Sequence, residues 1–225
     1  MKDQKMIKLI FTAALTLIFA ACSDSSTNPS GTNDNNVSMS VKLDEGAGDN
    51  SIVITEAKAL ITNVELETEP SGVSHSVRIN PFVIYFNTSG AVITVTSGTV
   101  PPGSYSKIKF KLHKPEDWET PPDPEFKEGT SGNLRYSFII KGLYNGNSFV
   151  YKSRKSLNLV VNFSRPVNFS NTNTNITVLV NPLIWFNNGS LDPRDPSNED
   201  EIDDNIKNSF RRAFRDNDKN GIDDN

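Results

Sequence analysis

The sequence predicts a mostly β protein, an antiparallel β-sandwich with Greek-key connections, followed by a C-terminal amphipathic helix. Apolar and polar residues alternate in short segments between residues 37 and 186, as expected for strands with one buried face. Turn residues separate about nine such segments, which is typical of a sandwich. Beyond residue 191 the apolar residues recur every three or four positions, which is typical of a helix.

The composition argues against several classes of protein. The chain has 225 residues, with 23 Lys and Arg against 27 Asp and Glu, so its formal net charge is −4. A charge this close to neutral does not favour nucleic-acid binding. The single cysteine, Cys22, excludes an intrachain disulfide framework and a four-cysteine zinc site.

Residues 1–21 are predicted to be an export signal. Three lysines precede a run of 13 apolar or weakly polar residues, Leu9 to Ala21. This run is too short to span a bilayer core about 30 Å thick, and it has the length of a signal-peptide core.

The signal ends in Phe19-Ala20-Ala21-Cys22, which resembles the lipobox of bacterial lipoproteins. The resemblance implies cleavage before Cys22 and acylation of its thiol and new amino group. Several acyl chains anchor a protein stably, at about 0.8 kcal/mol per buried CH₂. We therefore expect membrane attachment through this lipid in the bacterial cell envelope, and Ser23 favours the outer membrane. The alternative is an ordinary signal peptide followed by a buried free cysteine.

Residues 22–36 are predicted to be the lipidated cysteine and a disordered tether. After Cys22 the segment has no apolar side chain to bury, and a flexible coil of this length spans about 20 Å. The sandwich domain is expected at residues 37–188, and an acidic segment at residues 189–225.

Within the sandwich the clearest strand is Lys107 to His113, where Ile108, Phe110 and Leu112 share one face. Asn145-Gly146 predicts a two-residue hairpin, because both central residues of a type I′ turn need positive φ. A helical turn competes with a strand only at residues 56–59. The other strands are expected at residues 37–43, 52–55, 60–67, 76–86, 91–96, 136–140, 147–152, 157–163 and 175–186, where Trp185 is expected in the core.

The segment Pro101-Pro102-Gly103-Ser104-Tyr105 predicts a type II turn, with positive φ at Gly103, followed by a strand. The Tyr105 hydroxyl could bond back to this turn, as in a tyrosine corner. The motif resembles the Pro-Gly-x-Tyr entry of prealbumin-like and carboxypeptidase-regulatory-like domains. Together with the lipobox, the chain resembles a family of bacterial surface lipoprotein domains of unassigned function. The resemblance covers about residues 37–185 and implies a prealbumin-like or immunoglobulin-like fold and a surface location, but no chemistry.

The C-terminal segment is predicted to contain an amphipathic helix. From Leu191 to Asn225 there are 11 acidic and 6 basic residues. Acidic residues at the start of the helix and arginines near its end match the helix dipole, with Ser197 or Asn198 as the cap. The apolar stripe is expected to dock on the sandwich, or alternatively to bind a partner. It consists of Ile202, Ile206, Phe210, Ala213 and Phe214.

The last ten residues predict a calcium-binding loop. Their spacing resembles an EF-hand or dockerin loop, and more closely the Asp-rich repeats of bacterial surface and thrombospondin-type proteins. Gly221 would allow the sharp turn that brings the oxygen ligands to one point. The chain ends before the acid expected at position 12, so a further ligand would come from water, the terminal carboxylate, Asp192 or Asp195, and binding would be weak. The predicted ligands are Asp216, Asp218, Asn220, the Ile222 carbonyl and Asp224. The alternative is a solvated acidic end.

The long loop at residues 114–132 is rich in proline and carries Trp118. An exposed Trp118 could stack on a sugar ring, although a lid that packs Trp118 and Phe126 on the sheet edge is the simpler interpretation. Lys107, Lys109 and Lys111 could bind an anionic polymer, but a solvated face is the commoner role of such a stripe. His75 and His113 join no nucleophile motif, so we expect exposed histidines and no catalytic residue.

These features predict a non-catalytic ligand-binding or scaffolding module on the cell envelope, with a glycan or a protein as ligand. The alternatives are an assembly or adhesion component recruited through the C-terminal helix and, less favoured, a hydrolase of envelope polymers.

Overall fold

The computed structural model describes residues 35–44, 51–128 and 134–224, which all belong to one compact unit, Asn33–Asn225. The predicted export signal, Cys22 and most of the predicted tether lie outside the described residues. The fold begins slightly earlier than predicted, because Asn36 is buried and its side chain bonds the backbone of Val100 and Ser170. Within the described part of the chain, no helix is long and apolar enough to cross a membrane.

Strands are the main elements of the described fold. In chain order they are β1 (Val37–Leu43), β2 (Ile52–Thr68), β3 (Ser74–Arg78), β4 (Phe82–Tyr85), β5 (Ile93–Gly98), β6 (Gly103–Leu112), β7 (Phe138–Tyr144), β8 (Asn147–Ser153), β9 (Leu157–Phe169), β10 (Thr174–Val180) and β11 (Phe210–Arg215). The helical segments are η1 (Pro124–Phe126), η2 (Pro182–Ile184), η3 (Asn187–Gly189), η4 (Pro196–Asn198) and α1 (Glu199–Asn208).

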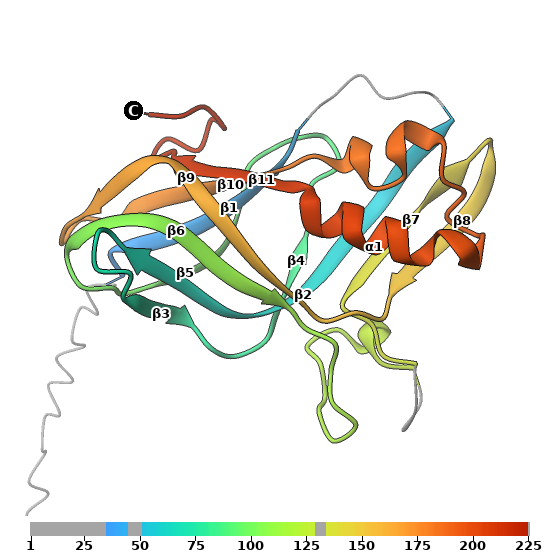
Figure 1. The fold of residues 1–225 in the computed structure, drawn as a ribbon, viewed down its shortest axis with the longest axis horizontal. Coiled ribbons are helices and arrows are strands. Elements are labelled where there is room, and N and C mark those ends of the chain that lie inside the picture. The colour runs from blue at the N-terminus through green and yellow to red at the C-terminus, as the bar shows by residue number, and fades with distance from the viewer. Residues whose placement is uncertain (1–34, 45–50, 129–133, 225) are drawn as a thin grey trace, which may run out of the picture. The chain divides into compact units, whose positions relative to one another are not determined.

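The strands form one curled, mixed sheet in the order β5-β1-β10-β11-β9-β6-β2-β7-β8, with β3 and β4 paired to β2. Two neighbouring pairs are parallel, β1 with β10 and β11 with β9, and the other pairs are antiparallel. Strand β11 pairs with β9 only at Ala213 and Phe163, and this pair joins the two halves of the sheet. In the view of Figure 1, β6 and β9 pass in front of β1.

The mostly β class predicted from the alternation is therefore confirmed. A wholly antiparallel arrangement is wrong, because β1 and β11 each have one parallel neighbour. The Greek-key, prealbumin-like sandwich stays a prediction. Residues 56–59, where a helical turn competed, lie inside the 17-residue strand β2, which pairs there with β7 and β4.

The core explains why these segments become strands. The alternating residues Ile108, Phe110 and Leu112 of β6 are buried, as predicted. They belong to one apolar cluster that also includes residues of β1 and β10, so the two halves of the sheet share a core. Trp185 is fully buried, as predicted, and its ring packs edge to face against Phe138, with ring centroids 5.3 Å apart.

Two predicted turns have different outcomes. Asn145 and Gly146 have φ of 49° and 76° between β7 and β8, which confirms the hairpin. The Tyr105 hydroxyl donates a 2.8 Å hydrogen bond to the Pro101 carbonyl, so the bond back to the turn is also confirmed. The predicted positive φ of Gly103 is wrong, because this residue already begins strand β6 and is not among the described residues with positive φ.

The C-terminal helix is shorter than predicted. Helix α1 ends at Asn208, and Phe210, Ala213 and Phe214 lie in strand β11 instead. The acidic first turn is as predicted, but Asn198 makes no capping side-chain bond. Ile202 and Ile206 are fully buried in the shared core, which confirms that the apolar stripe docks within the chain. Hydrogen bonding to β10 overrides the helical spacing of the last three apolar residues.

Candidate functional site

The acidic loop begins where strand β11 leaves the sheet. The backbone N–H of Asp216 donates to the Asn175 carbonyl at 3.0 Å, and the Asn175 side-chain amide donates to the Asp216 carbonyl at 2.8 Å. Asp216 therefore continues the pairing of β11 with β10, and the first residue of the loop has a fixed position. This placement follows from the sheet order, in which β11 lies beside β10.

Asp216 is fully buried, and its two carboxylate oxygens differ. Oδ2 accepts hydrogen bonds from the Thr177 hydroxyl at 2.6 Å and from the Gly221 N–H at 3.1 Å. Oδ1 is buried and has no hydrogen-bond partner. A buried carboxylate oxygen without a donor is costly, and such orphan groups frequently mark the position of an ion.

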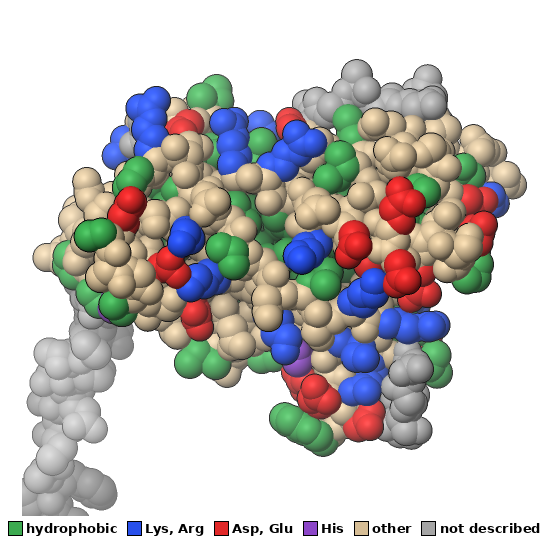
Figure 2. All heavy atoms as spheres, viewed as in Figure 1, with side chains coloured by type: hydrophobic (Ala, Val, Ile, Leu, Met, Phe, Trp, Pro, Cys, Tyr) green, Lys and Arg blue, Asp and Glu red, His purple; other side chains and the backbone are tan. Residues whose placement is uncertain are grey.

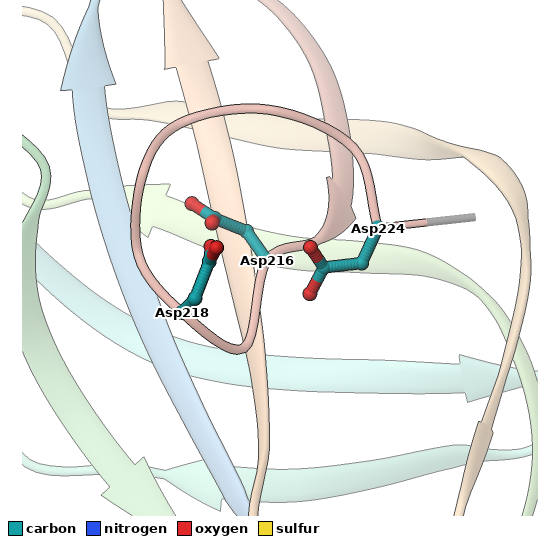
Figure 3. A group of neighbouring side chains, drawn as sticks. All are labelled: Asp216, Asp218 and Asp224. Carbon is teal, nitrogen blue, oxygen red and sulfur yellow. The ribbon is translucent and has the colours of Figure 1, made fainter.

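Two exposed carboxylates lie beside the carboxylate of Asp216. Asp216, Asp218 and Asp224 each offer one carboxylate oxygen, and the three oxygens lie within 4.8 Å of one another. Figure 3 shows the loop running around the three side chains, with their carboxylates turned towards its interior. Three carboxylates at this separation repel one another, and a cation between them would offset the repulsion. Oxygen ligands of this kind suit a hard divalent cation.

Backbone bonds fix Asp224 at position 9 of the loop. Its Oδ2 accepts from the Asn217 N–H at 2.5 Å, and its own N–H donates to the Arg215 carbonyl at 2.9 Å. Asn220 orients the middle of the loop, since its amide Nδ2 donates to Asp218 Oδ2 at 2.8 Å and its Oδ1 accepts from the Ile222 N–H at 2.7 Å. The loop is thus already closed before any metal enters.

Neighbouring strands hold the loop from outside. Gly221 has φ of +81°, as the predicted sharp turn requires, and a Cβ atom here would lie 2.6 Å from Cδ of Lys42 in β1. Lys219 Nζ donates to the Thr94 hydroxyl of β5 at 2.7 Å. The side chains that pack around the loop therefore come from β1, β5 and β10.

The structure brings together three of the five predicted calcium ligands, Asp216, Asp218 and Asp224. Asn220 contacts Asp218 and Ile222, and the role of the Ile222 carbonyl stays a prediction. The two acids considered as additional ligands do not join the cluster. Asp192 pairs with Arg194 at 2.8 Å, and Asp195 accepts from the N–H and hydroxyl of Ser197 at the start of η4.

The buried partners of Asp216 are not apparent from the loop motif. Thr177 and Asn175 come from β10, about 40 residues earlier in the sequence. The signal that could have found them is the alternation of Asn175 and Thr177 with the apolar residues of β10, where both polar residues are buried. A polar residue on a buried strand face needs a polar partner.

Trp118 has the exposure predicted for a ligand platform. Its side chain is 84% exposed, whereas Phe126 in the same loop is fully buried against Leu60, Tyr136 and Ile139. The lid that packs both aromatic residues is thus wrong for Trp118. Figure 2 shows apolar and acidic side chains on a projection at the bottom of the view, where this loop lies in Figure 1.

The two histidines are less exposed than predicted. His113 directly follows β6, and its side chain is 12% exposed, with Nε2 2.6 Å from Glu119 Oε2. His75 lies in β3 and is partly buried, and its ring packs edge to face against Tyr105. In the described part of the chain, no hydrogen bond joins either ring to a Ser, Thr or Tyr hydroxyl.

Two lysines of the stripe, Lys107 and Lys109, share one carboxylate. Lys107 bonds Glu67 at 2.6 Å, and Lys109 pairs with the other oxygen of the same carboxylate. These hydrogen bonds hold the pKa of Glu67 below its ordinary value. The three lysines together keep a net positive charge, so the solvated face and the binding of an anionic polymer both stay predictions.

A buried lysine that sequence reasoning missed fastens the Trp118 loop to the sheet. Lys58 Nζ lies 2.6 Å from both Asp123 and Glu125, and Tyr85 also donates to Asp123 at 3.0 Å. Burial alone would raise the pKa of Asp123, but the bonds from Lys58, Glu125 N–H and Tyr85 outweigh it and lower the pKa. A lysine among apolar residues at the centre of β2 was the available signal.

No protein-family model matches the chain, and no curated protein matches it significantly. Among solved structures it is similar to MbnP from Methylosinus trichosporium, at 11% sequence identity and a TM-score of 0.43. The match covers 67% of this chain and 77% of that one. A similarity this low carries no argument about function.

Proposed function

We propose that this chain is a lipid-anchored protein of the bacterial cell envelope, at the outer membrane, with a non-catalytic ligand-binding β domain and a C-terminal loop that binds Ca²⁺. One observation carries the calcium part. The buried carboxylate of Asp216 has one oxygen, Oδ1, without a hydrogen-bond partner, and this carboxylate clusters with those of Asp218 and Asp224.

The chemistry of the donor set favours calcium over a transition metal. The ligands are carboxylate oxygens, and neither histidine belongs to the cluster. Two of the three carboxylates are exposed, so water can complete the six to eight ligands that Ca²⁺ prefers. We expect extracellular-grade affinity, with Kd on the order of 10⁻⁴ to 10⁻³ M.

Calcium binding should stabilise the fold, because the loop is continuous with β11. At 10 mM Ca²⁺ this affinity range corresponds to about 1.4 to 2.7 kcal/mol of added free energy of unfolding. The experiment compares thermal unfolding of the purified protein in EDTA and in Ca²⁺, with calorimetric titration of Ca²⁺ into the protein. Asp216→Asn and Asp218→Asn should abolish both the shift in unfolding temperature and the binding heat.

Asp204→Asn is the matched control, because Asp204 is an exposed acid of helix α1 outside the cluster. This variant should keep the full calcium response. An equal response in Asp218→Asn and in Asp204→Asn would remove the loop as the site.

The lipid anchor rests on the resemblance of residues 19–22 to a lipobox. Expression with radiolabelled palmitate should label the protein, and Cys22→Ser should abolish the labelling. A soluble, unlabelled product from the unaltered sequence would contradict the anchor.

The alternative of recruitment through the C-terminal helix has less support. Its apolar residues Ile202 and Ile206 are fully buried within the chain, so they are not free to meet a partner. Ligand binding by the β domain is therefore the favoured role.

A further inference from the structure

We propose that Trp118 and the groove beside it form a binding site for a neutral saccharide. This inference rests on the ligand-binding part of the proposed function and names the class of ligand. It does not depend on the calcium loop, which is built from β10, β11 and the residues that follow β11.

Trp118 is exposed on a backbone that is held in place. Lys127 Nζ donates to the carbonyls of Asp117 and Glu119, on either side of the tryptophan, at 2.6 and 2.9 Å. The backbone N–H of Glu119 bonds the Glu116 carbonyl at 3.1 Å and closes the turn. A flexible loop would fold its indole onto apolar surface, whereas this turn keeps 84% of the Trp118 side chain in water.

Further bonds fasten the base of the turn. Arg135 Nη1 donates to the Pro115 carbonyl at 2.7 Å, and His113 bonds the Glu119 carboxylate. The Lys58 ion pairs hold the following segment to the sheet. The platform is therefore preorganised, so little conformational entropy is lost when a ligand covers it.

A groove of about 550 Å³ lies beside the indole. Its walls carry a second exposed apolar side chain, Ile79, which is 65% exposed. The lining also includes Asn63 and Asn80, which are exposed and for whose side chains no hydrogen bond is seen within the described part of the chain. Asn63 has φ of 53° at an irregularity where β2 pairs with β6, a device that commonly redirects a side chain.

This combination matches the chemistry of a sugar. The apolar face of a pyranose ring packs on an indole, and planar amides bond pairs of neighbouring hydroxyls. The volume accommodates one or two hexose rings, and the indole can extend the contact along a chain.

The charges around the groove favour an uncharged ligand. The groove is lined by one lysine, Lys111, and two glutamates, Glu116 and Glu119, so it carries no positive field that would attract an anion. A polyanion would meet the carboxylates of Glu116 and Asp117, which are 60% and 59% exposed. The same carboxylates disfavour insertion of Trp118 into an anionic lipid surface.

The two tryptophans give a direct assay. Trp185 is fully buried, so iodide quenches only Trp118 fluorescence in the folded protein. The purified protein is titrated with cellohexaose, chitohexaose and mannohexaose, and binding is confirmed by calorimetry. At least one of these should protect Trp118 from iodide in a saturable manner.

The variants locate the site. Trp118→Ala should weaken binding at least tenfold and Asn80→Ala about threefold, with unchanged unfolding temperatures. Trp118→Phe, which keeps an aromatic face, should retain part of the affinity. Val160→Ala, which trims an exposed apolar side chain of β9, should bind like the unaltered protein.

Four results would overturn the proposal: no protection by any of the three oligosaccharides, full binding by Trp118→Ala, protection only by polygalacturonate, or protection only by phosphatidylglycerol vesicles. Each titration is repeated in EDTA and in 10 mM Ca²⁺. If the protein binds none of the saccharides but still responds to Ca²⁺, the saccharide site is refuted and the proposed calcium loop is not.

Discussion

The hydroxyl of Thr177 donates a 2.6 Å hydrogen bond to Oδ2 of Asp216, so strand β10 holds the first residue of the acidic loop from inside the sheet. Both residues are fully buried. The acidic loop is therefore anchored directly to the sheet. Its one buried carboxylate, that of Asp216, accepts hydrogen bonds on Oδ2 but has no partner on Oδ1. Asp216 should therefore affect both the free energy of unfolding, through Oδ2, and ion binding, through Oδ1.

Thr177→Val should destabilise the protein in the absence of calcium. Valine has nearly the shape of threonine but lacks the hydroxyl that donates to Asp216 Oδ2. The buried carboxylate would lose this hydrogen bond while Oδ1 already has none, which costs about 1–3 kcal/mol of unfolding free energy. Urea denaturation in EDTA measures the change in free energy of unfolding. Thr177→Ser retains the hydroxyl and serves as the control, and equal stabilities of the two variants would contradict the role of this bond.

Gly142→Ala should be among the most damaging small substitutions. A Cβ atom at Gly142 would lie 2.1 Å from the Val53 carbonyl oxygen, in the middle of the β2–β7 ladder. The backbone must shift to accept the methyl group, so we expect a loss of about 3 kcal/mol.

Gly103→Ala is the control for this prediction. The nearest atom to a Cβ there is a Tyr105 ring carbon at 3.8 Å, and the backbone has no positive φ. The free energy of unfolding of Gly103→Ala should differ from that of the unaltered protein by no more than about 0.5 kcal/mol. Similar denaturation midpoints for both alanine variants would contradict the packing argument.

Lys58→Met should loosen the loop that carries Trp118. It would leave the carboxylate of Asp123 without its cation, beside Glu125, which would keep only Lys141. Breaking a buried pair from one side costs about 3 kcal/mol. Lys141→Met is the comparison, since Lys141 pairs with Glu125 at a more exposed position and should cost less than about 1 kcal/mol. Hydrogen exchange of residues 115–127 should increase only in the first variant.

Asp203 predicts a specific dependence of stability on pH. Burial raises the pKa of Asp203 above its ordinary 3.8, and the 2.8 Å bond from the Tyr151 hydroxyl offsets only part of this. Between 3.8 and the raised pKa the folded state binds more protons than the unfolded state. The contribution of Asp203 to stability therefore falls as pH rises through this window.

Asp203→Asn lacks this titration, so its stability relative to the original protein should increase with pH above about 4 and then level off. Urea denaturation between pH 4 and pH 8 measures this difference. A difference that stays constant over the whole range would contradict the raised pKa.

The sequence alone predicts the elements that are determined by residues close to one another in the chain. Alternation locates β1, β6 and β9, because a strand with one buried face requires that period. Asn145-Gly146 predicts its hairpin, because few other residue pairs accept two positive φ angles. The spacing of the acidic loop likewise predicts which carboxylates converge.

The sequence does not predict features that depend on distant neighbours. Phe210, Ala213 and Phe214 satisfy a helical spacing, yet they form a strand because β10 presents an open edge to them. The burial of Asp216 depends on Thr177 in the same way. Whether Trp118 packs or projects depends on cations from outside its turn, including Lys127.

The position of β11 in the sheet has a consequence for biogenesis. It follows every other strand in the sequence, yet it lies between β10 and β9 in the sheet. The ribosome must therefore release residues 210–215 before the two halves can close, and until then β9 and β10 present open edges. Truncation before residue 210 should therefore yield aggregates.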